Sequence, residues 1–442
     1  MPFGLNLLPV SIGRHQSIVS EEPELTASKK LGQESQPKAP AIPKSPGVVK
    51  AGFGQPRLRP LPRYHPASLC VLRLPLDEYP LFDILNNLSS ALRIMSIQPK
   101  FFDDPIAAAL LTKEYAEMYL SLWQSRSDNS VMIEVQHRKG DAVAFKRYAH
   151  SILEATRGRF NYGHPWKEAP LDVESLRQAE SVLAHTSRAS SEEEEAFVAF
   201  ESVHSLLSSA SFDARCLGLE SLCVFTDPRR TSIETSILFS LAVLSARAPK
   251  APLVARCKFI HRMILELVIL RKFEDRSFTQ TNAHADSDTE DLFPSDDESP
   301  SGGGAPEYAE FMSRVFHLSL TVVVNSIEVV ATFQGVSRLR VMDTANMAGA
   351  FLDSAKDIHD EADVLRTMMD CIRKAERKYH NAYLAARGLR FLCLASPDTR
   401  LSLIDMGALE HVARAHQIGS FNHSLLEEES KLLWDALHAK QH

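Results

Sequence analysis

The sequence predicts a mainly α-helical protein, in which a small module of helices and antiparallel strands precedes a larger domain of repeated helices. Three observations support this fold class. Apolar residues recur at helical spacing over most of the chain after Leu171, and two stretches between Tyr115 and Val135 alternate apolar and polar residues. Two segments of unusual composition interrupt these patterns. The 442 residues are more than one core usually holds, so we expect two or three domains.

Residues 1–67 are the first segment of unusual composition. Proline recurs from Pro37 to Pro66, and such a segment buries too little apolar surface to offset its chain entropy, so we predict a disordered arm. Ser17 follows Arg14 at the spacing of a basophilic kinase site, and Ser45 precedes Pro46 as in a proline-directed site. Both serines are candidate phosphorylation sites, and an unmodified linker is the alternative interpretation.

Residues 68–160 predict the small α+β module. Apolar residues at helical spacing indicate a helix over residues 80–97, followed by strands over 115–123 and 131–135. Gly140 and Asp141 then end the second strand, and Asp141 is a suitable N-cap for a second helix. The order of helix, antiparallel strands and helix is typical of a module with its helices on one face of the sheet.

The run from Val131 to Leu153 resembles the kinase-associated domain found at the ends of some protein kinases. In that family a strand rich in basic residues leads into a Gly-Asp turn and a helix. The resemblance implies a surface for anionic phospholipid or for intramolecular docking, carried by Arg138, Lys139, Lys146 and Arg147. An ordinary solvated face explains the same charges, and no kinase catalytic motif accompanies the run.

Residues 171–275 and 307–442 predict the helical domain, with a disordered acidic loop over residues 276–306 inserted in it. Residues 286–298 hold seven acids and no Lys or Arg, which accounts for the net charge of −7. Ser287 and Ser295 each precede an acid by three residues, the spacing that an acidophilic kinase prefers. They are candidate phosphorylation sites, and a passive solubilising insertion is the alternative.

The segment from Ala385 to Ser396, followed by residues 400–412, resembles the armadillo repeat. The family pattern joins a long helix with a Leu-x-x-Leu core to a signature that Asp405-Met-Gly-Ala-Leu409 supplies here, with Met where Ala is usual. A looser copy lies at residues 212–228, about four units of a ~40–47-residue repeat earlier. The resemblance implies an armadillo-like solenoid or an irregular helical repeat domain, with a surface that binds peptides or proteins. Arg387 and Arg390, on the long helix, are the candidate protein-binding residues.

The sequence predicts no catalytic residue, cofactor or metal site. It contains no GxGxxG, GxxxxGK[ST], GxSxG or HExxH motif. The acids and His359 between Asp357 and Asp363 are explained by a solvated helix N-terminus, and six cysteines without zinc-type spacing fit buried thiols.

These observations predict a non-enzymatic protein-interaction scaffold or adaptor, regulated by phosphorylation of its disordered segments. The net charge argues against a nucleic-acid partner. A cytoplasmic or nuclear location is expected, since there is neither a signal peptide nor a clean apolar run of the ~18–20 residues that span a membrane. Two alternatives are a regulatory protein that docks on anionic phospholipid through the α+β module, and an enzyme whose site lies between the domains.

Overall fold

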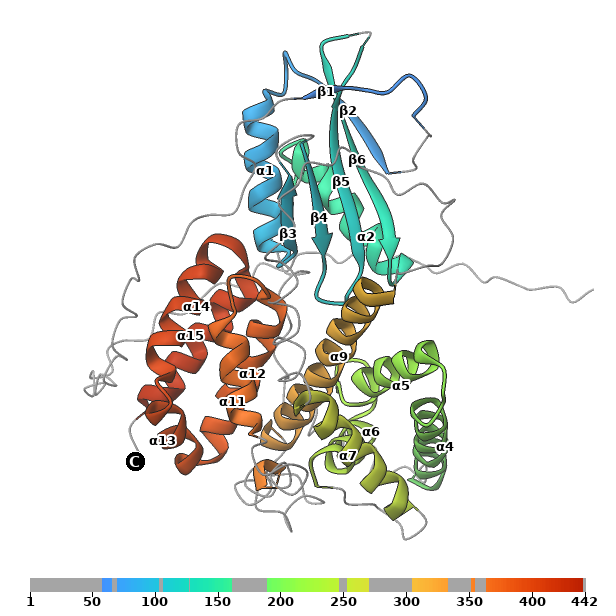
Figure 1. Cartoon of the computed structure of the whole chain (residues 1–442), viewed down its shortest axis with the longest axis vertical. Coiled ribbons are helices and arrows are strands. Elements are labelled where there is room, and N and C mark those ends of the chain that lie inside the picture. Colours follow the sequence, from blue (N-terminus) through green and yellow to red (C-terminus); the bar gives the residue numbers. More distant parts are fainter. Residues whose placement is uncertain are drawn as a thin grey trace, which may run out of the picture. The chain divides into compact units, whose positions relative to one another are not determined.

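Helices dominate the structure, and the strands lie between residues 59 and 139 (Figure 1). The computed structural model describes residues 58–65, 70–102, 106–126, 128–160, 189–245, 253–269, 304–332, 351–353 and 363–439. All of them belong to one compact unit, residues 41–442. It contains two hydrophobic cores, one in the sheet module and one in the helical domain. The predicted mainly α class with a small antiparallel sheet is confirmed.

The sheet module spans residues 58–160 and has strand order β2-β6-β5-β4-β3. Neighbours on this path are antiparallel, so the crossover helix α1 carries the chain from β2 at one edge to β3 at the other. Its elements are β1 (Arg59–Pro60), β2 (Val71–Pro75), α1 (Leu81–Ile94), β3 (Gln98–Phe102), β4 (Ala107–Leu111), β5 (Glu117–Gln124), β6 (Ser130–Lys139) and α2 (Ala142–Thr156).

One face of the sheet packs on the two helices. Alternate residues of β5, Met118, Leu120 and Leu122, are buried in the same core as Leu88 of α1 and Tyr148 of α2. The alternation that predicted β5 and β6 therefore reports the face that packs on the helices, although β6 is buried on both faces from Ser130 to Val135. Asp141 caps α2 as expected, because its side chain accepts a hydrogen bond from the Val143 N–H at 2.8 Å.

The first predicted helix is shorter than expected. α1 ends at Ile94, and Ser96 has a φ of +53°, which turns the chain into β3. Pro99 lies within β3, which is an edge strand where a missing N–H is tolerated. β2, β3 and β4 have no counterpart in the predicted strands, because β4 is alanine-rich and β2 and β3 each contain proline.

Residues 58–65, at the end of the predicted disordered arm, pack on the sheet. β4 begins at Ala107, opposite Ser121, so the last residues of β5 have an open edge, and there β1 pairs in parallel with Trp123 and Gln124. The Leu61 N–H donates to the Gln124 carbonyl at 2.9 Å. Residues 58–65 of the predicted arm therefore belong to the sheet module, and its other residues, 1–57, 66 and 67, lie outside the described part of the chain.

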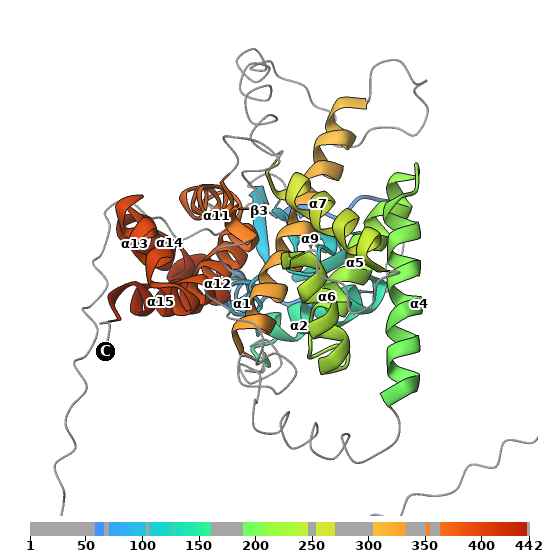
Figure 2. The same cartoon turned by 90° about the horizontal axis from the view of Figure 1, so that it is seen from below.

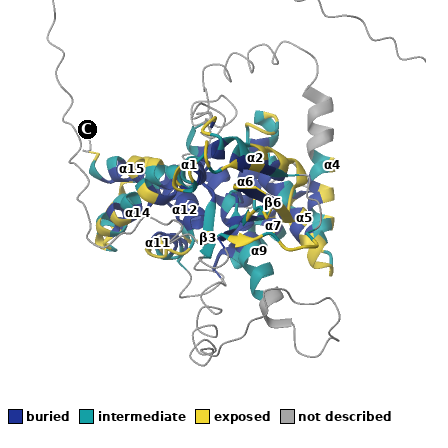
Figure 3. Cartoon of the chain, turned by 90° about the horizontal axis from the view of Figure 1, so that it is seen from above, coloured by how far each residue is buried: buried dark blue, intermediate teal, exposed yellow. Residues whose placement is uncertain are grey.

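The helical domain is built around α9 (Gly304–Thr332). α9 packs against α5, α6 and α7 on one side and against α12 on the other (Figure 2). The other helices are α4 (Ala189–Leu207), α5 (Phe212–Phe225), α6 (Ile233–Ser245), α7 (Val254–Ile269), α11 (Val364–Arg373), α12 (Tyr379–Ala395), α13 (Pro397–Asp405), α14 (Ala408–Asn422) and α15 (Ser424–His438). Every residue of α12 from Tyr379 to Leu389 is buried, and Figure 3 shows this helix in dark blue.

Residues 309–332 of α9 are also the one stretch, among the residues described, that is long and apolar enough to cross a membrane. Other parts of the protein bury 83% of its most apolar window. This degree of burial is typical of a core helix in a globular domain.

The turn that carries the armadillo-like signature contains a glycine in the left-handed conformation. α13 ends at Asp405, Gly407 adopts a φ of +79°, and α14 begins at Ala408. Only glycine adopts this left-handed backbone readily, so Gly407 permits the sharp change of direction between the two helices.

Candidate functional site

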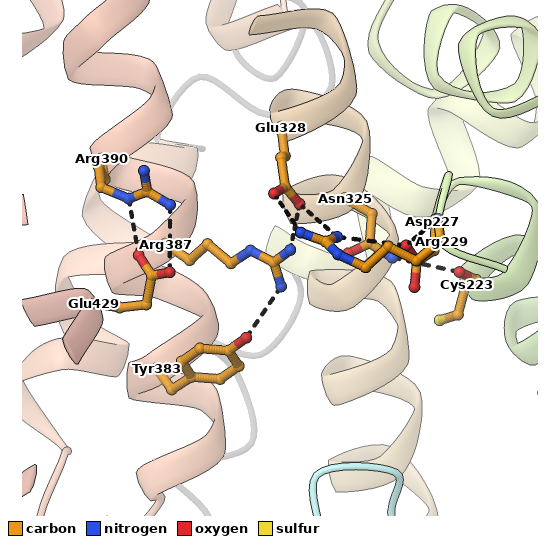
Figure 4. Close-up of polar contacts among 9 residues, drawn as sticks. All are labelled: Cys223, Asp227, Arg229, Asn325, Glu328, Tyr383, Arg387, Arg390 and Glu429. Atoms are coloured by element: carbon orange, nitrogen blue, oxygen red, sulfur yellow. Dashed lines mark hydrogen bonds and ion pairs between the residues drawn. The ribbon is translucent and has the colours of Figure 1, made fainter. Parts of the chain in front are cut away.

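A buried carboxylate, Glu328 of α9, lies at the centre of the helical domain. The residue is only 5% exposed. Its side chain contacts two guanidinium groups from either side: that of Arg387 on α12, and that of Arg229, which follows α5 (Figure 4). The distance from Arg229 Nη2 to Glu328 Oε1 is 3.0 Å. Glu328 therefore connects the two groups of helices that flank α9.

Further hydrogen bonds complete this network. Arg387 Nη1 donates to the Tyr383 hydroxyl at 3.0 Å, and Asn325 Nδ2 donates to the Cys223 carbonyl at 3.3 Å (Figure 4). Burying an ionised group is costly unless its partners replace the lost water. The contacts of Arg387 supply that replacement, so the network is an internal element of the fold.

A second ion pair joins α12 to α15. Arg390 Nε donates to Glu429 Oε2 at 2.8 Å, and Arg390 Nη2 lies 3.3 Å from Glu429 Oε1. The guanidinium also lies over the Phe391 ring, 4.1 Å from its centre. Burial raises the pKa of Glu429, and the positive charge of Arg390 opposes that rise.

The two candidate protein-binding residues are thus used inside the protein. Arg387 is 4% exposed, and the Arg390 side chain is 18% exposed. Both lie on α12, as the armadillo resemblance implied. Their guanidinium groups bind acids of the same chain, and we assign neither to a partner. Helical spacing alone did not reveal this, because α12 is buried on all sides along most of its length.

The four candidate docking residues of the sheet module lie together around the turn between β6 and α2. All are exposed. Arg138 is 3.7 Å from Glu117, Lys139 is 2.8 Å from Glu310 of α9, and Arg147 is 3.0 Å from Glu114. These three acids belong to the chain itself, so they offset much of the positive charge. The remaining candidate, Lys146, lies on the same exposed surface.

Glu117 and Glu310 meet where this turn approaches α9. Burial raises the pKa of Glu117, and its hydrogen bond with Glu310 raises it further. The pKa of Glu310 is lowered, chiefly by its hydrogen bond with Lys139. The positive charge of Lys139, 2.8 Å from Glu310, offsets the repulsion between the two acids at the contact between sheet module and helical domain.

Several other predicted residues are not described. Ser17, Ser45, Ser287 and Ser295 lie outside the described residues, as do Asp357 and His359. Asp363, at the end of that acidic cluster, accepts a hydrogen bond from the Arg366 N–H at 3.1 Å and caps α11. The predicted helix N-terminus is therefore present at this residue.

The turn between β4 and β5 contacts the helical domain. Tyr115 has a φ of +63°, at a hairpin position that usually holds glycine. Its hydroxyl donates to Ser313 Oγ at 3.1 Å, and its ring lies 5.0 Å from that of His317, both on α9. A strained non-glycine residue is retained where the fold requires its side chain, and here that side chain reaches across the junction between sheet module and helical domain.

Three buried histidines from the helical domain surround this turn: His317 of α9, His380 of α12 and His423, which precedes α15. Ring nitrogens of His380 and His317 contact the Leu111 carbonyl at 2.9 Å and the Lys113 carbonyl at 3.1 Å. Sequence reasoning missed these residues, because isolated histidines in three helical segments carry no common spacing.

The end of α1 also contacts the helical domain. Arg93 donates to the Ser420 carbonyl at 2.7 Å and to Glu427 at 2.6 Å. Ser96 Oγ accepts a hydrogen bond from the Leu425 N–H at 2.9 Å. We call this set of contacts, from α1 and from the β4–β5 turn, the module junction.

The chemistry available at these sites is limited. No group of three or more histidine, cysteine or acidic residues is placed to bind a metal ion within the described ranges. Burial raises the pKa of the Cys223 and Cys393 thiols to about 12, which keeps them protonated. These thiols therefore suit packing better than nucleophilic chemistry.

No family model, curated protein or solved structure matches this chain. Its function is therefore argued from its own geometry.

Proposed function

We propose that this protein is a non-enzymatic interaction scaffold, in which the helical domain binds a partner protein and the sheet module is fixed to it as one platform. The observation that carries the proposal is the presence of two exposed leucines within the armadillo-like segment. Leu394, near the end of α12, is 62% exposed, and Leu401 of α13 is 52% exposed. Burying such side chains against a partner contributes roughly 25 cal/mol per Å² of apolar surface.

The arrangement of α12, α13 and α14 supports an armadillo-like unit. A long helix is followed by a short helix, a left-handed glycine and a third helix. α5 and α12, which carry the two similar sequence segments, both pack against α9. This arrangement favours an irregular armadillo-like bundle over an open solenoid, so the partner surface lies on the outer helices.

The module junction supports a single platform. Side chains at the end of α1, the Tyr115 hydroxyl and the Leu111 carbonyl contact α9, α12 and the α14–α15 region. A module linked by a flexible connection alone would not need a strained Tyr115 or the buried Ser96. The cytoplasmic or nuclear location, and regulation at Ser17, Ser45, Ser287 and Ser295, remain parts of the proposal.

The test is quantitative affinity capture with the full chain as bait. Leu394→Asp and Leu401→Asp place a charge on an exposed apolar position, so both variants are expected to fold and to lose the partner. Phe82→Asp on α1 and Val143→Asp on α2 are matched controls, since both residues are more exposed still. Equal recovery by all four variants, or no reproducible partner, would contradict the proposal.

A second candidate function is docking on anionic phospholipid through the turn between β6 and α2. The observation that favours it is Val143, which is 77% exposed close to Lys146. An apolar side chain within a basic surface suits the boundary of a charged membrane.

Sedimentation with phosphatidylserine vesicles at low salt tests this candidate. Binding is expected to be absent with phosphatidylcholine vesicles and to fall with Lys146→Glu and Val143→Asp. The lipid reading fails if the full chain does not sediment with either vesicle, and the leucine variants of the helical domain serve as folded controls.

A further inference from the structure

Two backbone carbonyls of the β4–β5 turn fix the proton positions of two buried histidines. The Leu111 carbonyl faces His380 Nε2, and the Lys113 carbonyl faces His317 Nε2. A carbonyl oxygen only accepts hydrogen bonds, so both Nε2 atoms carry the hydrogen. A neutral imidazole has a single N–H, which leaves each Nδ1 with a lone pair.

The contact between His380 and His423 extends this assignment. His423 Nε2 lies 3.1 Å from His380 Nδ1, and since His380 Nδ1 is an acceptor, His423 Nε2 is the donor. His423 Nδ1 then accepts the hydrogen bond of the Leu426 N–H at 3.2 Å, at the first turn of α15. Hydrogen bonds therefore occupy all four nitrogens of His380 and His423.

This series of hydrogen bonds has no place for a further proton. A hydrogen on His380 Nδ1 would face the N–H of His423, and a hydrogen on His423 Nδ1 would face the backbone N–H of Leu426. Either arrangement sets two donors against each other and removes a hydrogen bond. Both rings are buried, so water does not take the place of the lost partner.

We propose that His380 and His423 form an acid-sensitive latch, whose protonation loosens the β4–β5 turn, and with it the sheet module, from the helical domain. The latch holds while both rings are neutral. In the loosened state the rings meet water and bind protons with the affinity of an ordinary histidine. Proton uptake is therefore coupled to opening of the module junction.

The charged groups around the latch also disfavour protonation of its two rings. Lys113, on the turn, lowers the pKa of both rings, although burial is the larger cause for each. His317 faces His380 from α9 with ring centres 6.2 Å apart, and Asn381 Oδ1 lies 3.0 Å from its Nδ1. A proton on His317 would gain this acceptor and would repel a second proton on His380.

The acids and phenols near the latch are engaged elsewhere or uncharged. Glu114 of the turn binds Arg147 and the Tyr148 hydroxyl, and Glu427 of α15 binds Arg93. The phenol rings of Tyr379 and Tyr383, on α12, lie 5.8 and 6.3 Å from the His423 ring. Burial raises the pKa of Tyr379, which therefore stays neutral.

Hydrogen exchange of the full chain, corrected for the intrinsic pH dependence of the exchange rate, tests the latch. Protection of amides in residues 111–116 and 424–427 is compared with that of the α2 core at pH 7.5 and pH 5.0. Each ring that takes up a proton is expected to raise the opening equilibrium roughly 30-fold over this interval. Equal protection ratios at the two pH values, or simultaneous loss of all protection, would overturn the proposal.

His380→Gln is the informative variant. Its amide can donate to the Leu111 carbonyl and accept from His423 without binding a proton, so the pH dependence should shrink while the junction stays closed at pH 7.5. His423→Asn gives a second test, since Asn is also a good N-cap for α15. His150→Gln, at an exposed position of α2, is the matched control. An undiminished pH response in both latch variants would contradict the mechanism.

Discussion

The charge of Glu328 can be removed without changing the shape of its side chain. Glu328→Gln keeps one carbonyl oxygen as an acceptor and removes the negative charge that faces Arg387 and Arg229. Arg229 is partly exposed, with 23% of its side chain accessible, so water can solvate its charge when Glu328 is neutral. Arg387 is buried and has the neutral Tyr383 hydroxyl as its other partner in Figure 4.

The expected cost follows from this difference between the two arginines. Leaving one buried charge without its counter-ion typically destabilises a protein by about 3–5 kcal/mol. Arg387 keeps its electrostatic interaction with Glu429, and the exposed side of Arg229 adds little, so we expect the lower end of this range, about 3 kcal/mol, for Glu328→Gln. Glu328→Gln combined with Arg387→Met removes both charges, and the pair should be less destabilising than the sum of the two single substitutions.

Urea unfolding followed by far-ultraviolet circular dichroism measures these values. Glu220→Gln is the matched control, because Glu220 pairs with Arg314 and both side chains are at least one-third exposed, and such pairs contribute at most about 1 kcal/mol. A cost for Glu328→Gln no larger than that for Glu220→Gln would refute the reasoning. Additive effects of the two substitutions in the double variant would do so as well.

Three further predictions concern glycine, histidine and cysteine. In Gly407→Ala the added Cβ meets no atom within 4 Å, so the variant should lose only the stability that the left-handed backbone demands, about 1 kcal/mol. In Gly419→Ala the added Cβ would meet the Glu427 backbone, so the loss of stability in thermal unfolding should be several times larger. Burial lowers the pKa of His380 to about 3, against about 6.5 in the unfolded chain, so the unfolded state binds the proton first as the pH falls. Protonation of His380 therefore has no effect on stability well above pH 6.5. At pH 5 it should reduce the free energy of unfolding, measured with urea, by about 2 kcal/mol. The buried Cys223, with its pKa raised to about 12, should resist iodoacetamide at pH 8 in the native protein and react once urea unfolds it; rapid native labelling would contradict its placement.

Local features of the fold were predictable from the sequence. Strands β5 and β6 alternate because one face packs on helices, and Asp141 precedes α2 because its carboxylate satisfies a free N–H. Gly407 marks the turn after α13 because that turn needs a positive φ. In each case neighbours in the sequence determine the structure.

The residues that define the candidate sites depend on contacts distant in the sequence. Arg387 was expected on a binding surface because its position on α12 was known, but the helices that bury it were not. The two histidines of the latch and the neighbouring His317 come from three segments and meet only around the β4–β5 turn. β1 lies on the sheet because β5 extends beyond β4. No pattern within one segment predicts these contacts.

Affinity capture by the double variant Leu394→Asp/Leu401→Asp, set against Phe82→Asp/Val143→Asp in the same full-length background, tests the scaffold function most directly. The account predicts that partner recovery falls at least tenfold, a loss of about 1.4 kcal/mol in binding, for the helical pair alone, with unfolding curves that match those of the control pair. Undiminished recovery by the helical variant, or an equal loss in both variants, would contradict it.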